Sequence, residues 1–577
     1  MASKEQIAAL RAALSDHKID AFLIPRAGPW PGEFVPENAE RLAWISGFTG
    51  SAGIGIIAAK SAIVLTDGRY SIQVKEQVDE EIWQAGDIRN ITASQWLCDT
   101  LSAGARVGFD PSLHSLKTTD KLRRLLEAHQ IELVSLDFNP VDRLWTDRPP
   151  TPQEPVTLFD EKIAGRSAAE KCHEIAAILQ KNKVTACFLS APDSVAWLLN
   201  IRGRDVPHVP VPLCTALITE DASVTLFIDP ARISKEVRAA LGSEVEIFSV
   251  DEMSARFSEI KGAVQVDPMQ LSVKVAEDLK QAGLSLQHEA DPCIDLKAIK
   301  TESEQAAIKR AHVIDAQPLE QLRQWLKSGK GEGVSEVAIA EKIDEFRRMN
   351  SNDFAGTSFD TIAGWRGNGA VIHYRAEPEN ALTIEGPGLL LIDSGGQYES
   401  GGTTDLTRTY ALGGTPAKEQ KRYYTLVLKS HIAAARAVFP AGTTGVQIDA
   451  MARAPLWEHG LDFPHGLGHG VGCFLNVHED GARLSPAANV VLKPGMLISN
   501  EPGLYFEGEY GIRLENLVLV QRTGKKDNLG RALLCFETVS AAYFDEDLID
   551  FAFLSTEEKA WLGEYHTRVS AVLSKTT

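Results

Sequence analysis

Short apolar runs alternate with amphipathic helical stretches along the first three hundred residues. Apolar runs of strand length occur at residues 18–24 (KIDAFLI), 62–70 (AIVLTDGRY) and 107–112 (VGFDPS). Between such runs lie segments with helical periodicity, for example EKCHEIAAILQKN at residues 170–182. Apolar strands that alternate with helices predict α/β domains.

The order of these elements occurs twice. In the first half of this region a strand is followed by an Ala-Trp element, a strand that ends in Asp with Arg shortly after, and a strand that ends in Asp-Pro. The same order returns at residues 184–190, 195–203, 224–232 and 264–272. A chance likeness between two α/β domains is the alternative. We predict two similar domains, residues 1–150 and 151–298, joined by the proline-rich stretch 147–155.

A different pattern begins near residue 299. Thr301 and Glu304 form a capping-box pattern ahead of a helical stretch that extends to about residue 326, and a second helix is predicted over residues 335–349. Beyond it the chain becomes rich in strands and glycine. We expect a third domain over residues 299–525, followed by an extension over residues 526–577 that ends in an amphipathic helix.

Composition narrows the functional class. The chain has 577 residues, of which 44% are hydrophobic and 24% charged, as in ordinary globular proteins. Its formal net charge of −19 argues against nucleic-acid binding. No apolar run approaches the roughly 18 residues of a membrane span, and the N-terminal segment lacks the apolar core of a secretory signal. The 7 cysteines form no C-x-x-C pair, which favours reduced thiols and a cytoplasmic protein.

Four acidic residues stand in or beside apolar strands of the third domain: Asp393, Asp405, Glu501 and Glu515. Carboxylates that meet in a buried place repel one another, so they need cations between them. The basic candidates nearby, Arg408, Arg513 and Lys493, are too few to balance four charges. Oxygen ligands with one or two imidazoles suit Mn²⁺, Co²⁺ or Zn²⁺, and the predominance of oxygen favours Mn²⁺.

Three histidines lie close together in HGLGHGVGCFLNVHE, residues 465–479. The stretch contains no H-E-x-x-H motif and no cysteine pair, so it matches no common zinc signature. The pattern alone leaves open which of these histidines binds a metal.

Five blocks of the third domain resemble the pita-bread metallopeptidases, the family of methionine aminopeptidase, prolidase, aminopeptidase P and the metal-free creatinase. In chain order they read LLIDSGGQY, GGTTDLTRT, HGLGHGVG, NEPGLY and GIRLEN. The resemblance implies an α/β (α+β) chain in which two creatinase-like N-terminal domains precede a pita-bread catalytic domain.

The resemblance also implies a centre of two divalent metal ions, most simply Mn²⁺. Its ligands would be Asp393, Asp405, His469, Glu501 and Glu515. Asp405 and Glu515 would bridge both ions, Asp393 would chelate one, and His469 with Glu501 would bind the other.

Three residues acquire catalytic roles from the same resemblance. Glu501 would take the proton of an attacking water held between the two ions. His478 and His373 would contact the scissile carbonyl and stabilise its oxyanion.

Two further residues are candidates for substrate binding. His465 would shape the pocket, with a purely structural role as the alternative. Arg69, in the TDGRY block of the first domain, would reach a substrate in a dimer, although a salt-bridged surface arginine is equally consistent with its sequence.

The implied activity is the removal of the first residue from peptides with proline in second position. Two front domains match the long form of aminopeptidase P, whereas prolidase, which cleaves Xaa-Pro dipeptides, has one. Prolidase-like dipeptidase activity and a metal-free scaffold of the same fold are the alternatives. We expect a homodimer that acts on peptides and binds neither nucleic acid nor membrane.

Overall fold

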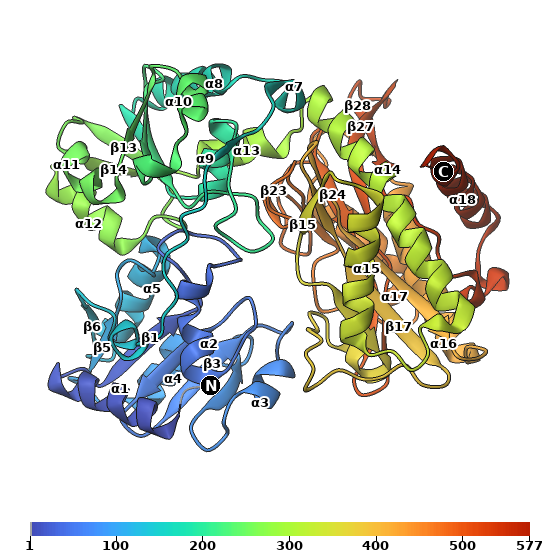
Figure 1. Cartoon of the computed structure of the whole chain (residues 1–577), viewed down its shortest axis with the longest axis horizontal. Helices are drawn as coiled ribbons and strands as arrows, with labels where there is room; N and C mark the ends of the chain where they lie inside the picture. The colour runs from blue at the N-terminus through green and yellow to red at the C-terminus, as the bar shows by residue number, and fades with distance from the viewer. Residues whose placement is uncertain (1–2, 577) are drawn as a thin grey trace. The chain divides into compact units, whose positions relative to one another are not determined.

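The computed structural model describes residues 3–576 and divides the chain into two compact units (Figure 1). Unit 1 comprises Met1–Phe159 and Arg166–Cys293, and unit 2 comprises Asp160–Gly165 and Ile294–Thr577. Most of both predicted front domains therefore belongs to unit 1, and their boundary near residue 150 stays a prediction. Among the described residues no helix has the length and apolar character needed to cross a membrane.

The first half of unit 1 is built on a six-stranded sheet with the order β4-β3-β2-β1-β5-β6. Strands β1, β2 and β3 are antiparallel neighbours, while β4, β5 and β6 join in parallel. The strands are β1 Ala21–Pro25, β2 Ile54–Ala58, β3 Ala62–Thr66, β4 Gln84–Asp87, β5 Arg106–Phe109 and β6 Glu132–Ser135.

The second half of unit 1 repeats this sheet strand by strand. Its order is β12-β11-β10-β8-β13-β14, with antiparallel and parallel pairings at the equivalent positions. Its strands are β8 Ala186–Leu189, β10 Thr215–Thr219, β11 Val224–Phe227, β12 Val245–Phe248, β13 Ala263–Val266 and β14 Ser285–His288. The predicted internal repeat is confirmed, because both sheet order and strand direction agree. A short two-stranded ladder, β7 Thr157–Leu158 with β9 Ile201–Arg202, completes the strands of unit 1.

Both faces of the first sheet are buried, which explains why its strands read as continuous apolar runs. Along β1, Phe22 and Ile24 belong to one hydrophobic cluster, and Ala21 and Leu23 belong to another on the opposite face. Helices cover these faces. In the first half they are α1 Lys4–Asp16, α2 Arg41–Ser46, α3 Gln73–Gln77, α4 Ala93–Thr100, α5 Leu116–Glu127 and α6 Pro140–Leu144. In the second half they are α8 Ala168–Asn182, α9 Pro192–Leu198, α10 Lys235–Leu241, α11 Met253–Phe257 and α12 Val273–Gln281. Helix α13, Pro292–Ala298, begins at the end of unit 1 and lies mostly in unit 2.

Unit 2 includes the short helix α7 (Glu161–Ala164) and opens its main body with two long helices, α14 (Glu302–Trp325) and α15 (Glu336–Asn350), which lie side by side (Figure 1). Thr301 caps α14, and Glu304 completes the predicted capping box. Helices α16 (Lys418–Ala435) and α17 (Gly445–Trp457) pack together farther along the chain.

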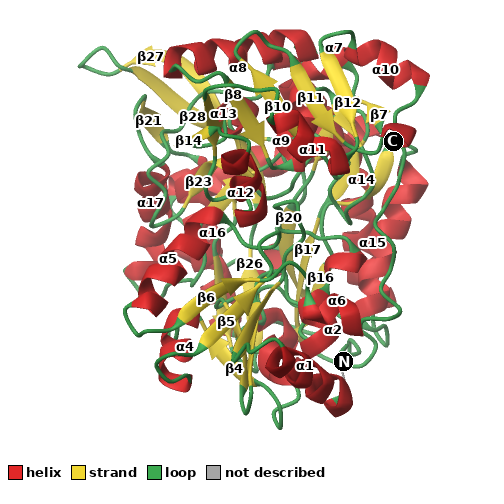
Figure 2. Ribbon diagram, turned by 90° about the vertical axis from the view of Figure 1, so that its left-hand side faces the viewer, coloured by secondary structure: helices red, strands yellow, loops and turns green. Residues whose placement is uncertain are grey.

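Four groups of strands build the rest of unit 2. Figure 2 shows β16, β17 and β20, which form one antiparallel sheet, next to one another. A second sheet has the order β21-β28-β27-β24-β22-β23, and two small sheets have the orders β15-β18-β19 and β25-β26. The strands are β15 Phe354–Thr357, β16 Ile362–Trp365, β17 Gly388–Ser394, β18 Gly396–Tyr398, β19 Gly402–Thr403, β20 Leu406–Leu412, β21 Val438–Pro440, β22 Gly468–Gly470, β23 Glu479–Leu484, β24 Leu497–Asn500, β25 Gly503–Phe506, β26 Tyr510–Arg513, β27 Asn516–Lys526 and β28 Ala532–Thr538.

The C-terminal extension is part of the core of unit 2. Strand β28 pairs with β27, and the last helix, α18 (Thr556–Thr576), packs beside α14. Arg408 of β20 is fully buried and donates to the Tyr565 hydroxyl of α18 and to the Ala542 carbonyl, both at 2.9 Å. The extension therefore contributes to the same folded body as the catalytic motifs.

Candidate metal centre

The strand registers of unit 2 bring the five predicted ligands to neighbouring strand ends. Asp393 lies near the end of β17, and Asp405 directly precedes β20, the strand that pairs with β17. His469 lies in β22, beside β24, and Glu501 directly follows β24. Because Asn500 pairs with Asn516 across β24 and β27, Glu515 lies at the same end as Glu501.

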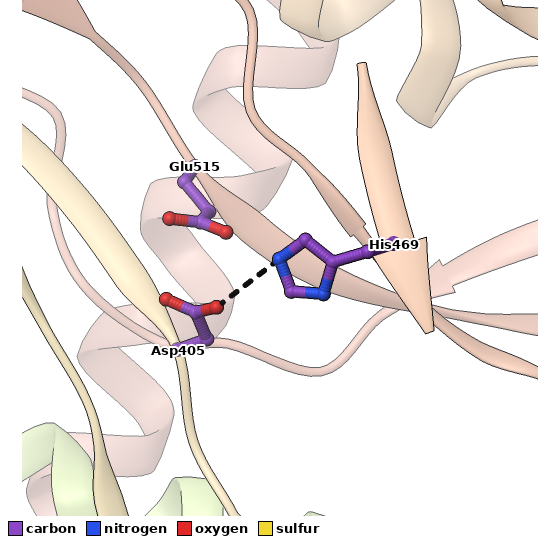
Figure 3. A group of neighbouring side chains, drawn as sticks. All are labelled: Asp405, His469 and Glu515. Atoms are coloured by element: carbon purple, nitrogen blue, oxygen red, sulfur yellow. Dashed lines mark ion pairs between the residues drawn. The ribbon is translucent and has the colours of Figure 1, made fainter. Parts of the chain in front are cut away.

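Three of these side chains converge closely enough to share one ion (Figure 3). Asp405, His469 and Glu515 each offer one ligand atom, and these atoms lie within 4.8 Å of one another. His469 Nε2 lies 3.5 Å from Asp405 Oδ2 and 3.4 Å from Glu501 Oε1. His469 Nδ1 lies 3.0 Å from the Gly470 carbonyl, to which it can only donate, so in the neutral ring the lone pair is on Nε2, the atom that faces the carboxylates.

Three of the carboxylates, Asp405, Glu501 and Glu515, have raised pKa values. Burial, Asp393 and Glu501 raise the pKa of Asp405 well above its ordinary value. Burial, Asp405, Glu501 and Asp393 raise the pKa of Glu515 in the same way. Burial raises the pKa of Glu501 to about 7, although Arg513 opposes the shift. The predicted convergence of four acidic groups is thus present in the structure.

The centre fits divalent cations because it offers buried oxygens that protein groups do not satisfy. Within residues 3–576, Asp393 Oδ1 and Glu515 Oε1 are buried and have no hydrogen-bond partner. An unpaired buried oxygen of this kind is costly unless it is neutralised or bound to a metal. Two divalent ions would offset the four carboxylate charges, and carboxylate oxygens with one imidazole suit Mn²⁺, Co²⁺ or Zn²⁺.

One arginine, which the sequence suggested only as a possible charge partner, organises the carboxylates. Arg513 donates to Asp393 Oδ2 at 2.7 Å, to the Tyr505 hydroxyl at 3.0 Å and to Thr407 Oγ1 at 3.2 Å. Thr407 in turn donates to Glu515 Oε2 at 2.7 Å. The signal that could have identified its role is its position in the apolar strand β26, two residues before a ligand. A charged residue there rarely lacks a partner.

Two of the predicted substrate-contacting histidines lie beside the ligands. The His478 ring is perpendicular to that of His469, with ring centroids 4.3 Å apart. His373, from the loop after β16, has its ring nearly parallel to His478 at a centroid distance of 6.4 Å. His478 also lowers the pKa of Asp405 and Glu501 through its charge. The arrangement gives the centre imidazole donors on one side, where a carbonyl oxygen can be bound.

His465 lies farther from the ligand atoms and connects to them through two other residues. Its Nδ1 contacts the Gly466 carbonyl at 2.7 Å, and its Nε2 contacts the Tyr505 hydroxyl at 2.8 Å. Desolvation and Arg513 lower the pKa of His465 to about 3, so the ring is neutral. Tyr505 links it to Arg513. Its role in shaping the pocket stays a prediction.

Arg69 lies in unit 1, on the turn after β3. It forms a two-pronged pair with Asp67, with Nη2 to Oδ2 at 2.8 Å and Nε to Oδ1 at 3.0 Å, and lies 3.7 Å from Glu33. These are the contacts of a salt-bridged arginine within its own unit. A role in binding substrate stays a prediction.

Comparisons with known proteins agree with the architecture. The model of metallopeptidase family M24 matches residues 306–522, and that of the C-terminal region of peptidase M24 matches residues 532–576. Two models of the creatinase/prolidase N-terminal domain match residues 6–143 and 147–304. The predicted fold class, two creatinase-like domains followed by a pita-bread domain, is confirmed.

Full-length relatives extend this agreement to the whole chain. A probable Xaa-Pro aminopeptidase P of Laccaria bicolor is 38% identical over 97% of this chain and 89% of its own. The crystal structure of an X-prolyl aminopeptidase from Caenorhabditis elegans, described as a cytosolic enzyme with a di-nuclear active site, matches with a TM-score of 0.92 and 30% identity, covering 100% of this chain and 97% of that one. A prolidase from Pyrococcus horikoshii matches with a TM-score of 0.53 and 26% identity, covering 65% of this chain and 99% of its own. The chain therefore belongs to metallopeptidase family M24, among its full-length Xaa-Pro aminopeptidase P relatives.

Proposed function

We propose that this chain is a metal-dependent aminopeptidase that releases the first residue of peptides with proline in second position. The observation that carries the proposal is the convergence of four carboxylates, three of them buried, and His469, with His478 and His373 nearby. The full-length relatives named Xaa-Pro aminopeptidase P supply the substrate class. The prolidase match leaves about a third of this chain uncovered, which favours an aminopeptidase over a dipeptidase.

We assign the metal site to Asp393, Asp405, His469, Glu501 and Glu515, and the physiological ion to Mn²⁺. Two such ions would supply Lewis acidity and lower the pKa of a water shared between them. Arg513 and Thr407 hold Asp393 and Glu515 by hydrogen bonds, so these ligands are oriented before any ion arrives.

The remaining steps belong to side chains around the centre. Glu501 accepts the proton of the attacking water. Its Oε1 receives a hydrogen bond from Ser499 Oγ at 3.0 Å, and Ser499 Oγ accepts from the His469 amide at 3.0 Å, so one serine fixes two ligands. His478 and His373 donate to the carbonyl oxygen of the scissile bond as negative charge develops there. The free amino group of the substrate binds on the Asp393 side, which restricts cleavage to the first residue.

The metal-free scaffold is the weaker candidate. A scaffold of this fold would have to keep Asp393 Oδ1 and Glu515 Oε1 buried without partners, at a cost to its own stability. We further propose that the protein is a cytoplasmic homodimer. The description of the Caenorhabditis elegans enzyme as cytosolic supports its location.

Hydrolysis of three peptides tests the proposal directly. Arg-Pro-Pro, Arg-Pro and Arg-Ala-Pro are incubated with chelator-treated protein, with and without added Mn²⁺, and released arginine is measured. We expect Mn²⁺-dependent release from Arg-Pro-Pro and little from Arg-Ala-Pro. Turnover of Arg-Pro alone would establish the dipeptidase alternative. Turnover of none of the three by Mn²⁺-loaded protein would refute peptidase activity of this class.

A further inference from the structure

A buried ion pair between the helices α14 and α15 contacts the hairpin that carries the proposed ligands Asp393 and Asp405. Arg347 of α15 donates through Nε to Asp315 Oδ1 of α14 at 2.8 Å and through Nη2 to Oδ2 at 3.3 Å. The Arg347 side chain is 0% exposed and that of Asp315 3%. Neither residue touches a proposed ligand, so the site described above gives them no role.

The same two side chains hold both ends of the hairpin between Asp393 and Asp405. At the first end, Arg347 donates to Ser394 Oγ and to the Gly395 carbonyl, both at 3.2 Å. At the other end, Thr404 Oγ1 donates to Asp315 Oδ2 at 2.7 Å. Ser394 and Thr404 are the immediate neighbours of the two ligands.

One further contact joins the two ends of the hairpin, and another holds its middle to Asp315. The Gly396 amide donates to Thr404 Oγ1 at 2.9 Å, and Tyr398, between the ends, donates its hydroxyl to Asp315 Oδ1 at 2.7 Å. Asp315 therefore accepts from Arg347, Tyr398 and Thr404, and its charge is fully compensated. Burial would raise the pKa of Asp315, but Arg347 and these hydroxyl groups outweigh burial and lower it, so the pair stays ionised.

A buried ion pair is rarely the most stable way to fill a core, because apolar side chains of the same volume often do as well or better. Its advantage is direction, since guanidinium and carboxylate groups fix the positions of their partners. Here the partners come from two helices and from both sides of one ligand-bearing hairpin.

We propose that the Asp315–Arg347 pair is a positioning device that sets the separation of Asp393 and Asp405 and thereby controls metal affinity. The proposal rests on the proposed metal centre. Substitutions in this network should weaken metal binding even though none removes a ligand. Loss of a group that supports a ligand typically costs about 10- to 100-fold in metal affinity or activity.

Thr404→Val provides the sharpest test. Valine keeps the shape of threonine but removes the hydroxyl that joins Asp315 to the Gly396 amide. Thr404→Ser, the matched control, keeps the hydroxyl and loses only a methyl. The full-length chain is stripped with chelator and titrated with Mn²⁺ by calorimetry, at a temperature where thermal melts show each variant folded. We expect the valine variant to bind Mn²⁺ about 10- to 100-fold more weakly and the serine variant within about threefold of the unmodified chain.

A second pair of variants separates positioning from a general loss of stability, and also serves if the valine variant does not fold. Arg347→Lys keeps the charge beside Asp315 but cannot also reach Ser394 and Gly395. Arg232→Lys makes the same change in the buried Arg232–Asp205 pair of unit 1. Both should lower the melting temperature, but only Arg347→Lys should weaken Mn²⁺ binding. Unchanged affinity in the folded Thr404 or Arg347 variants would overturn the positioning role alone. Absence of Mn²⁺ binding by the unmodified chain would instead overturn the metal centre itself.

Discussion

The buried His431 should make unit 2 sensitive to mild acid. This histidine lies in α16, where Nδ1 contacts the Asn500 carbonyl and Nε2 contacts the side-chain amide of Asn516, each at 3.1 Å. A carbonyl only accepts and an amide NH₂ only donates, so the ring is neutral with its proton on Nδ1. Asn500 directly precedes Glu501, and Asn516 directly follows Glu515. His431 thus joins the two strand ends that carry these proposed ligands.

The pKa of His431 sets the size of the effect. Burial and the charge of Arg408 lower it from 6.5 to about 3. A group whose pKa is lowered in the folded state stabilises the fold at pH values above its unfolded-state pKa. This stabilisation is lost as the pH falls towards the folded-state pKa. At pH 5 the ring is protonated in the unfolded chain but not in the folded chain. Protonation stabilises the unfolded chain, so the free energy of unfolding is about 2 kcal/mol lower at pH 5 than at pH 8.

The variant His431→Gln isolates this contribution. A glutamine side chain can donate to one partner and accept from the other, but it does not titrate. Urea-induced unfolding of the full chain, followed by tryptophan fluorescence at pH 8 and pH 5, gives the change in unfolding free energy for each protein. Unmodified protein should lose about 2 kcal/mol more than the variant over this range. His173→Gln, on the surface of unit 1, controls for the substitution. Equal losses in the unmodified protein and the His431 variant would refute the reasoning.

Three further predictions follow from the centre and its surroundings. His469→Ala should lose bound Mn²⁺, whereas His478→Ala should keep it and lose about 10²–10³-fold in kcat; elemental analysis with steady-state kinetics distinguishes them, and the reverse pattern would exchange their roles. In chelated protein the pKa of Glu501 is raised from 4.5 to about 7, so its protonated form stabilises the fold. This stabilisation is full below pH 4.5 and is lost as the pH rises through 7. In the chelated His431→Gln variant, in which the opposing contribution of His431 is removed, the melting temperature should therefore fall between pH 5 and pH 8, and Mn²⁺ should restore it at pH 8. A melting temperature that stays level in this variant would contradict the prediction. A Cβ at Gly402 would lie 2.1 Å from a side chain of α14, so Gly402→Ala should destabilise unit 2 by about 1–3 kcal/mol, measured by urea unfolding. An unchanged urea midpoint would show that the helix yields freely.

The fold was largely predictable because its signals are local. Apolar runs bounded by turns indicated the strands of unit 1, and the repeated order of elements indicated two similar sheets. The strand order within each sheet was not predictable, since it depends on pairings between distant segments such as β1 with β5. The domain boundaries near residues 150 and 298 stay predictions: the first lies inside unit 1, and the two units change at Cys293 and Ile294, a few residues before the second.

The candidate site was predictable where a residue contradicted its surroundings. Acidic groups in apolar strands drew attention to the proposed ligands, and the structure brings these together. No comparable signal marks the arginines at the end of α15, where charged residues are common and do not reveal which side chain is buried. Arg347 and Arg348 are adjacent in the sequence, yet the first side chain is 0% exposed and the second 66%. Only the packing of α14 against α15 and the ligand hairpin distinguishes them.

The position of the last helix in the core of unit 2 has a consequence for how the protein matures. Arg408, three residues after Asp405, has two of its hydrogen-bond partners at Ala542 and Tyr565, so its environment is complete only when residues as far as Tyr565 have been made. Ribosomes add about 5–20 residues per second, so roughly 7 to 30 seconds separate the synthesis of these partners from that of Arg408. The two strand ends that carry Glu501 and Glu515 are made within the same interval, so they too form after β20 has been synthesised. We therefore expect the centre to bind its metal ions only after the last helix has been made and has packed against β20.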